Sequence, residues 1–373
     1  MQINGKGLEF FFHKTELCVV IVGSLFKRST GRGIFKEEHF FGYLFPDAFF
    51  FKRFSQFNIQ CMQAALRVHA HYLDLASELS DLKTAEQFNL HDEFERAGLF
   101  ALVNAGAAPG VTNMLVQDIA EHFDHLDHVK IRLLEHQDAE RFEFLWSVQT
   151  TLDDIASPPL VIKKGKPQFV QPLCDEEWFE YPHPFGKHRA YNLYGDELAT
   201  LPRYIQRCDI DCKSGGSDIE HAVLLSRIGL FSKEPVRIND RCSVSPYELL
   251  NHLKFEVPTP HQMKQYVKQG IVKDGFFVAV VCVQGKIKNR SVCLQKSVVF
   301  PSLRQALRLC PQTSSYIAYA AGTAAYAFLS PFERVIHAGV LPPEALTMQE
   351  RRIVARVLRA KAVRITPFKE VRG

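Results

Sequence analysis

The residue types best suited to chemistry gather in one stretch, Asn104 to Leu115, which reads Asn-Ala-Gly-Ala-Ala-Pro-Gly-Val-Thr-Asn-Met-Leu. An apolar run precedes this stretch, and Pro109-Gly110 leads into a predicted helix. If the run is a strand of an open parallel sheet, the loop lies at the carboxyl edge, where helix N-terminal amides can meet a ligand. Thr112 and Asn113 would add short polar side chains there. The alternative interpretation is a tight turn whose glycines serve only the backbone.

Two short apolar runs and the helices between them must position this loop. Residues 71–76 (His-Tyr-Leu-Asp-Leu-Ala) and 99–105 (Leu-Phe-Ala-Leu-Val-Asn-Ala) are predicted strands. Residues 84–98 form a predicted charged helix that ends at a glycine, and residues 111–123 form a further predicted helix. Strand, helix, strand and helix at these lengths predict right-handed crossovers and two adjacent parallel strands.

The first sixty residues follow a different pattern. Thirteen of the 30 phenylalanines lie between Phe10 and Phe57, with neither a helical nor a strand period. The β-branched run from Glu16 to Gly23 predicts a buried parallel strand. A dinucleotide site needs Gly-x-Gly-x-x-Gly directly after such a strand, but Ser-Leu-Phe-Lys-Arg follows here.

Two interpretations of this N-terminal region stay open. In one, residues 24–57 are not homologous to a nucleotide-binding half, because the reading frame is damaged. In the other, a divergent loop holds phosphate with glycines and basic side chains. Its members would be Lys27, Arg28, Gly31, Arg32 and Gly33.

Beyond His128 the pattern predicts antiparallel strands. Residues 128–136 form a predicted strand, residues 159–170 a hairpin that turns near Gly165, and residues 276–300 a strand pair that turns at Gly285. The last part returns to helix. Residues 316–329 are rich in Ala and Gly, and Thr347-Met-Gln-Glu350 is a capping box that begins a helix through Ala362.

Four blocks in this order resemble the saccharopine dehydrogenase superfamily, which includes saccharopine reductases, carboxynorspermidine dehydrogenases and lysine 6-dehydrogenases. The blocks are Tyr72-Leu-Asp-Leu, the Gly-Ala-Ala-Pro-Gly-Val loop, Tyr194-Gly-Asp-Glu-Leu-Ala-Thr-Leu-Pro202 and Gly339-Val-Leu-Pro-Pro-Glu344. The resemblance runs from about Tyr72 to the C-terminus. It implies an α/β fold with a Rossmann-like parallel sheet, whose N-terminal half is incomplete, and an inserted α+β domain. The implied parts are a partial dinucleotide-binding domain over 1–123 (24–57 atypical), a substrate and dimerisation domain over 124–310, and C-terminal helices over 311–373 that pack back.

The resemblance also implies an NAD(P)-dependent oxidoreductase that acts on a small amino-acid-like or carbonyl/imine substrate, with NADP or NAD as cofactor, as a homodimer. It places Gly23, Ala108, Pro109 and Gly110 at the cofactor, and Tyr72, Asp74, Thr112, Asn113, Lys187 and Arg203 at the substrate. Saccharopine-type members usually have an acidic residue where this chain has Ala108, so recognition of an ammonium or imine group by that carboxylate stays open. No general acid or base is identified. The competing interpretation is a non-enzymatic remnant, a scaffold or dimerisation module that has lost its cofactor site.

Composition restricts the other classes of function. The net charge of +4 argues against nucleic acid as a partner. The apolar stretch Leu17 to Phe26 is too short to span a bilayer, so no membrane partner is expected. Nine scattered cysteines indicate reduced thiols and a cytoplasmic location.

Two side-chain clusters have alternative interpretations. His122, His125 and His128 could hold a metal ion, but a solvated helix end is the preferred interpretation, and no metal site is predicted. Arg352, Arg356 and Arg359 form a basic stripe that could contact an anionic surface. We interpret it as the solvated face of a docked helix.

We predict that this chain binds NADPH or NADH weakly or not at all. Ser24, Leu25 and Phe26 put side chains where a pyrophosphate must contact backbone amides. Each charge-assisted hydrogen bond is worth roughly 1.5–3 kcal/mol, so two lost bonds weaken binding by about two to four decades. Titration of the protein with each nucleotide, followed by nicotinamide fluorescence, measures this. Saturation at low micromolar nucleotide would contradict the prediction and favour the divergent phosphate loop.

Overall fold

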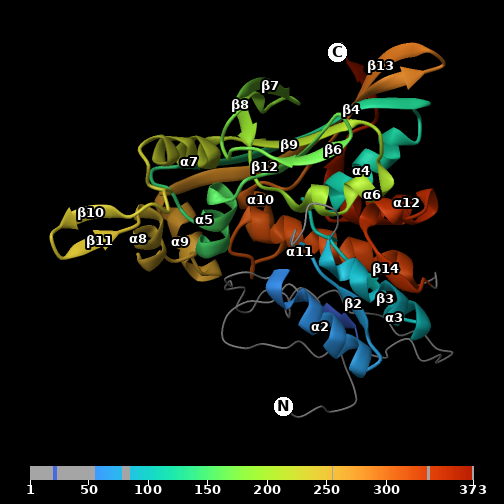
Figure 1. The fold of residues 1–373 in the computed structure, drawn as a ribbon, viewed down its shortest axis with the longest axis horizontal. Coiled ribbons are helices and arrows are strands. Elements are labelled where there is room, and N and C mark those ends of the chain that lie inside the picture. Colours follow the sequence, from blue (N-terminus) through green and yellow to red (C-terminus); the bar gives the residue numbers. More distant parts are fainter. Residues whose placement is uncertain (1–19, 23–54, 78–84, 254, 334–336, 372–373) are drawn as a thin grey trace.

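The computed structural model describes residues 20–22, 55–77, 85–253, 255–333 and 337–371 (Figure 1). A small four-stranded sheet has the order β1-β2-β3-β14. Its strands are β1 (Val20–Val22), β2 (His71–Leu73), β3 (Phe100–Leu102) and β14 (Gly339–Leu341). Strands β2 and β3 pair in parallel, with Tyr72 opposite Ala101, which confirms the predicted adjacent parallel strands. Strand β14 extends the parallel set beside β3.

The direction of strand β1 differs from the predicted one. The run around Val20–Val22 was expected to be parallel, but β1 pairs antiparallel with β2, with Ile21 opposite Tyr72. Apolar β-branched residues predict that a strand is buried, but they do not fix its direction, which depends on the partner edge and on the connection.

Four helical segments accompany the small sheet. They are α2 (Ser55–Arg67), η1 (Glu86–Leu90), α3 (His91–Arg96) and α4 (Val111–Ala120). The single helix expected over 84–98 is therefore two segments, a 3-10 turn followed by a short α-helix. The glycine expected past its end is present, since Gly98 adopts φ +63° and Gly98 N–H donates to Glu95.

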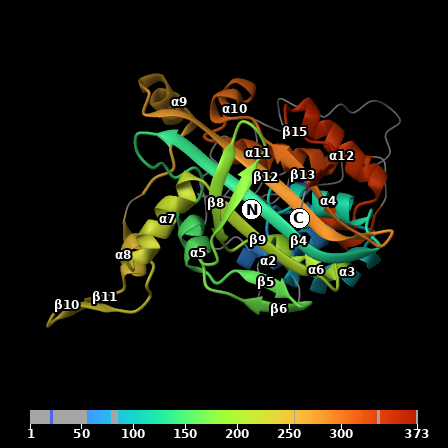
Figure 2. The same cartoon turned by 90° about the horizontal axis from the view of Figure 1, so that it is seen from above.

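A ten-stranded sheet forms the other half of the molecule, and its main path has the order β15-β13-β12-β4-β9-β5-β6. Figure 2 shows its long strands β4, β12 and β13 side by side. The pairs are antiparallel except β4 with β9, which is parallel. Its strands are β4 (His125–Ala139), β5 (Leu160–Lys163), β6 (Lys166–Phe169), β7 (Glu177–Tyr181), β8 (Gly186–Asn192), β9 (Asp209–Gly215), β12 (Val272–Ile287), β13 (Arg290–Val299), β15 (Arg364–Ile365) and β16 (Lys369–Val371).

The two predicted hairpins differ in how well their turns were located. The β5–β6 hairpin turns at Lys164-Gly165, as expected. The β12–β13 hairpin turns at Lys288-Asn289, not at Gly285, and both turn residues have positive φ. Gly285 instead lies within β12, where an added Cβ would stand 2.1 Å from the His125 carbonyl oxygen. That glycine permits close approach of β4, not a turn.

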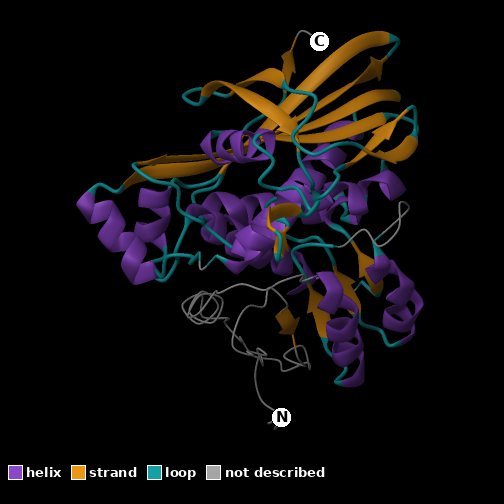
Figure 3. Ribbon diagram, turned by 60° about the vertical axis from the view of Figure 1, so that its left-hand side comes forward, coloured by secondary structure: helices purple, strands orange, loops and turns teal. Residues whose placement is uncertain are grey.

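Helices lie between the two sheets, as Figure 3 shows. One core cluster includes Leu73 of the small sheet, Met114 of α4, Val281 of the large sheet and Ala324 of α11 (Tyr316–Leu329). Because these side chains share one core, the two sheets are held together by apolar burial. The face of the large sheet that carries Val281 is called the inner face below, and the opposite face the outer face.

The C-terminal segment contributes to both sheets. Strand β14 joins the small sheet, whereas β15 and β16 join the large one. Helix α12 (Met348–Ala360) begins at the predicted capping box, in which Thr347 and Glu350 bond reciprocally. The domain boundaries at 123/124 and 310/311 stay predictions. Among the described residues, no helix has the length and apolar character needed to cross a membrane.

The remaining elements are short helices and a separate two-stranded sheet, β10–β11. They are α5 (Val148–Ala156), η2 (Asp196–Ala199), α6 (Leu201–Tyr204), α7 (Ser217–Arg227), β10 (Val236–Asn239), β11 (Cys242–Val244), α8 (Pro246–His252), α9 (Pro260–Gln269), α10 (Leu303–Leu309), η3 (Ser330–Glu333) and η4 (Pro343–Ala345).

Candidate functional site

The loop from Asn104 to Gly110 is folded tightly between β3 and α4. Asn104 adopts φ +57°, and its N–H donates to Asp74 Oδ1 at 2.8 Å. The Ala108-Pro109 peptide is cis. Gly110 has φ +125°, and an added Cβ would lie 2.1 Å from the Gly106 carbonyl oxygen. Only glycine fits Gly110 without displacing backbone.

The N-terminus of α4 does not present its first amides to a ligand. Val111 N–H donates to the Gly106 carbonyl at 2.9 Å, and Thr112 N–H donates to the Ala107 carbonyl at 3.3 Å. A pyrophosphate would need such amides unpaired. These two amides are therefore not available to the phosphates of a dinucleotide. Gly23, the other predicted phosphate contact, lies outside the described residues.

A cavity of about 130 Å³ lies beside this loop, against the inner face of the large sheet. Ala108 and Pro109 form part of its wall. Aromatic and carboxylate side chains dominate the remainder. Its other lining residues include Glu135, Phe142, Glu143, Phe144, Trp146, Asp154, Tyr194, Asp196, Glu197, Ser214 and Asp218.

Four of the carboxylates around this cavity lack a cationic partner. They are called the acidic cluster below. None of the ion pairs formed among the described residues involves a member of it. Glu197 is buried and the other members are half-buried. Carboxylates withdrawn from water are normally paired, so a cationic ligand would remove an electrostatic cost here. The acidic cluster is Glu135, Asp154, Glu197 and Asp218.

Burial and mutual repulsion keep protons on this cluster. Burial raises the pKa of Glu135 to about 8, and the negative charges of Asp218 and Glu197 add to the rise. Burial also raises the pKa of Asp218 to about 6, although hydrogen bonds from Gln137 and Ser217 oppose the change. The pKa of Asp154 is raised well above its usual value, first by burial and then by neighbouring carboxylates. The Glu135 side chain is therefore protonated at neutral pH.

The strand pattern of β4 explains how Glu135 reaches the cavity. Val129, Ile131 and Leu133 alternate on the inner face and are buried. Glu135 continues that alternation and so points inward. A carboxylate at an otherwise apolar inward position was visible in the sequence, and the prediction missed it.

The predicted residues Thr112 and Asn113 are fully buried and bond to protein groups. Thr112 Oγ1 donates to Glu197 Oε1 at 3.3 Å, which positions one member of the acidic cluster. Asn113 Nδ2 donates to the Glu197 carbonyl, to Thr200 Oγ1 and to Glu344 Oε1. Neither residue lines the cavity.

Tyr72 and Asp74 also lie inside the protein and away from the cavity lining. Tyr72 Oη donates to Asn58 Oδ1 at 3.3 Å. Asp74 accepts from Asn104 N–H and from Gln87 Nε2, while burial raises its pKa to about 7 against these hydrogen bonds.

The basic residues Lys187 and Arg203 are exposed and stack on rings. Lys187 Nζ lies 5.7 Å from the ring centre of Trp178, and the Arg203 guanidinium lies 4.5 Å from that of Phe88. Neither lines the cavity.

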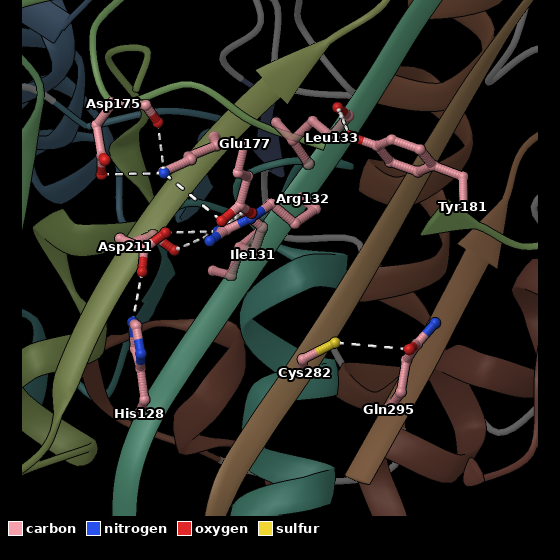
Figure 4. A network of polar contacts seen from close by, with 11 residues as sticks. His128, Ile131, Arg132, Leu133, Asp175, Glu177, Tyr181, Asp211, Cys282 and Gln295 are labelled. Carbon is pink, nitrogen blue, oxygen red and sulfur yellow. Dashed lines mark hydrogen bonds and ion pairs between the residues drawn. The ribbon is translucent and has the colours of Figure 1, made fainter. Parts of the chain in front are cut away.

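The outer face of β4 carries a contrasting, paired network (Figure 4). Arg132 is almost fully buried and forms ion pairs with Glu177 and Asp211, and Asp211 also pairs with His128. Burial alone would raise the pKa of Asp211, but His128 and Arg132 hold it at about 2. Lys213, which lies on β9, also pairs with Glu177. This network is internally neutralised.

One group with metal-ligand character exists among the described residues. His91, Asp92 and Glu95 bring three potential ligand atoms within 4.8 Å of one another. Both carboxylates are exposed, and His91 Nδ1 accepts from Val340 N–H at 3.1 Å. In the alternative histidine trio, His125 pairs with Asp127 and His128 pairs with Asp211.

No protein-family model matches this chain. It is 27% identical over 216 residues to carboxynorspermidine synthase of Vibrio cholerae, which covers 54% of this chain and 51% of that enzyme. It is 26% identical over 215 residues to carboxyaminopropylagmatine dehydrogenase of Synechocystis sp., with 55% and 52% covered. The chain thus spans about half the length of the curated relatives it matches.

Two solved structures share its fold. Saccharopine dehydrogenase (L-Glu forming) from Saccharomyces cerevisiae superposes with a TM-score of 0.57 at 11% identity, covering 85% of this chain and 83% of that one. Homospermidine synthase from Legionella pneumophila, in complex with NAD, superposes with a TM-score of 0.60 at 10% identity, covering 84% and 73%.

We predict that Glu135 makes the protein less stable as pH rises. The folded-state pKa of about 8 exceeds the unfolded value of about 4.3, so its stabilising contribution is complete below pH 4 and is lost as pH rises towards 8. Glu135→Gln should match the wild type at pH 4. At pH 8.5 it should be more stable by about 2 kcal/mol, a figure reduced for screening by cavity water. Urea denaturation at both pH values measures the difference.

Glu180→Gln, which changes an exposed carboxylate on β7, is the matched control. An equal pH-dependent gain in both variants would show that general surface repulsion, not the cavity, causes the effect.

Proposed function

Because the chain belongs to the saccharopine dehydrogenase-like superfamily, we propose that it is a nicotinamide-dependent oxidoreductase whose substrate carries cationic amine groups. The observation that supports this most directly is the acidic cluster. Four carboxylates without cationic partners border one cavity beside the Ala108-Pro109 loop. The names of three similar proteins contain norspermidine, agmatine and homospermidine, all of them polycationic amines.

The lining residues have complementary roles in this proposal. Ammonium groups would pair with members of the acidic cluster, where low polarity strengthens each contact. Methylene segments between them would pack on Trp146, Phe142 and Phe144. A ligand held this way needs no surface cation from the protein, which agrees with the placement of Lys187 outside the cavity.

Glu135 is the group that we propose handles the proton. Reduction of a carbon–nitrogen double bond adds a hydride to carbon and a proton to nitrogen. With a pKa near 8, Glu135 is protonated at neutral pH and can donate to that nitrogen. In the reverse direction its carboxylate accepts the proton.

The nicotinamide cofactor, NADP or NAD, would supply or accept the hydride. The solved homospermidine synthase holds NAD, and the loop Ala108-Pro109 adjoins the cavity in this chain. The Val111 and Thr112 amides are already paired and are not available to the phosphates, so we derive no step through the dinucleotide.

A second candidate function is an amine-binding protein that has lost its cofactor site. The absence of Gly-x-Gly-x-x-Gly after Gly23 favours it. Both candidates need the acidic cavity, and they differ only in whether amine binding is accompanied by nicotinamide turnover.

We predict that a linear triamine binds the purified chain at pH 7.5 and that Asp218→Asn weakens binding about tenfold. One lost ion pair in a partly buried site accounts for roughly 1.4 kcal/mol. Isothermal titration with norspermidine measures the affinity, and a monoamine of equal length should bind far more weakly. NADPH and NADH oxidation with an added amine and aldehyde tests turnover separately.

Glu140→Gln, which changes an exposed carboxylate just beyond β4, is the matched control and should bind like the wild type. Triamine binding without turnover would favour the second candidate. If the triamine does not bind saturably, or if both variants lose the same affinity for it, neither candidate function is supported.

We also propose that two chains associate through the large sheet, within 124–310. The edge strand β6 is exposed throughout, but Lys166 and Pro167 hinder addition of another strand. Association across a face of the sheet therefore fits better than edge pairing, and Trp178 offers an exposed aromatic there.

We predict that sedimentation velocity at micromolar concentration gives a species of twice the 42.5 kDa chain mass. Trp178→Ala should shift the population towards monomer, whereas Phe169→Ala on the β6 edge should not. A monomer throughout this range would contradict association through the sheet.

A further inference from the structure

Two buried thiols lie beside each other on the outer face of the large sheet. Cys282 of β12 is opposite Lys130 of β4 and Gln295 of β13. Cys293 lies two residues before Gln295 on β13, so it projects from the same face and is the diagonal neighbour of Cys282. Cys282 Sγ donates to Gln295 Oε1 at 3.6 Å, a contact that is drawn in Figure 4.

The pair is buried but borders an open volume. Cys282 and Cys293 are 5% and 6% exposed. A cavity of about 730 Å³, distinct from the acidic one, lies at this end of the β12–β13 hairpin and includes Cys293 in its wall. A small solute can therefore reach Cys293 without unfolding the sheet. The other lining residues are Asp127, Gln284, Gly285, Ser291, Val292, Glu370 and Val371.

The surroundings assign different roles to the two sulfurs. The neighbouring Cys282 lowers the pKa of Cys293 to about 7 against the effect of burial, with help from Gln284 and the Lys130 charge. Cys293 and burial together raise the pKa of Cys282. Cys293 is thus the member that carries thiolate at neutral pH, and the thiolate is the nucleophile.

We propose that Cys282 and Cys293 form a redox-active pair that hydrogen peroxide, entering through the neighbouring cavity, converts to a disulfide. The Cys293 thiolate attacks one peroxide oxygen and the O–O bond breaks. The leaving hydroxide takes up a proton and departs as water, and Cys293 becomes a sulfenic acid. The Cys282 sulfur then attacks Cys293, the S–O bond breaks, and a second water leaves. Two thiols lose two hydrogens in total, and one peroxide is reduced to two waters.

Closure requires a small movement of the strands. Diagonal neighbours in an antiparallel pair stand about 7–8 Å apart, whereas a disulfide needs Cα atoms within about 6.8 Å. Strand β16 flanks β13 at this end and pairs with it over only three of the described residues, one of which is Cys293. Strand β13 can therefore shift towards β12. A bond closed under such strain is readily reduced.

The test uses the full chain with a few equivalents of hydrogen peroxide, followed by differential alkylation and peptide mapping. We expect a linked pair of peptides containing Cys282 and Cys293, two hydrogens lighter than the thiols and restored by dithiothreitol. Cys242 on β11 is an exposed thiol in the same chain and is the internal control, which should not enter the linkage. Cys282→Ala should leave Cys293 as a sulfenic acid that dimedone traps, and Cys293→Ser should leave Cys282 reduced.

The mapping of the unsubstituted protein does not depend on whether either variant folds. The proposal would be overturned if Cys282 and Cys293 can both still be alkylated under conditions that oxidise Cys242. Linkage of Cys293 to any other cysteine would overturn it equally. Neither result depends on amine binding or on turnover, so this proposal and the proposed function can fail separately.

Discussion

The cost of keeping unpaired carboxylates inside the protein is the constraint on which the rest of this structure depends. Removing an ionised carboxylate from water is expensive, and a shift in pKa is the usual relief. The acidic cluster follows this rule, since Glu135 and Asp218 keep their protons to unusually high pH. The remaining cost must be offset by apolar burial, and the core shared by both sheets surrounds the cavity. A cationic ligand would relieve the same cost directly, which is why ligand binding and stability are coupled here.

The four sequence blocks that resemble the superfamily meet in one buried hydrogen-bond network. Asp74 of the first block accepts from Asn104, which begins the loop of the second. Asn113, just past the loop, donates to Glu197 in the third block and to Glu344 in the fourth. These polar residues therefore hold segments more than two hundred residues apart in the sequence at one place. Such networks are costly to break, because each member left without a partner remains buried.

The predictions that the structure confirmed rest on local sequence patterns, and those that it corrected depend on partners distant in the sequence. The parallel pairing of β2 with β3 followed from two apolar runs and an intervening helix, which are local patterns. The capping box at Thr347 and the turn near Gly165 were local signals too. The direction of β1, the turn at Lys288-Asn289 and the division of residues 84–98 depend on partners distant in the sequence.

The candidate site was harder to predict than the fold. The sequence located the Ala108-Pro109 loop but not the carboxylates opposite it. Glu135, Asp154 and Asp218 come from three different elements, and no spacing in the chain brings them together. Conversely, Thr112 and Asn113 have the residue types of ligand contacts, yet they bond to protein groups. Residue type alone does not distinguish a polar group that binds a ligand from one that joins two parts of the fold.

Strand β4 carries both electrostatic systems, one on each face. Its inward residues end at Glu135 in the acidic cavity, and its outward residues include Arg132 in a paired network. A one-residue slip in register would move Arg132 to the inner face and Glu135 to the outer one. The slip would neutralise the cavity and leave Glu177 and Asp211 without their cation. The fourteen-residue pairing of β4 with β12 opposes such a slip, so the register of this one pair keeps the unpaired charge on the side that a ligand can reach.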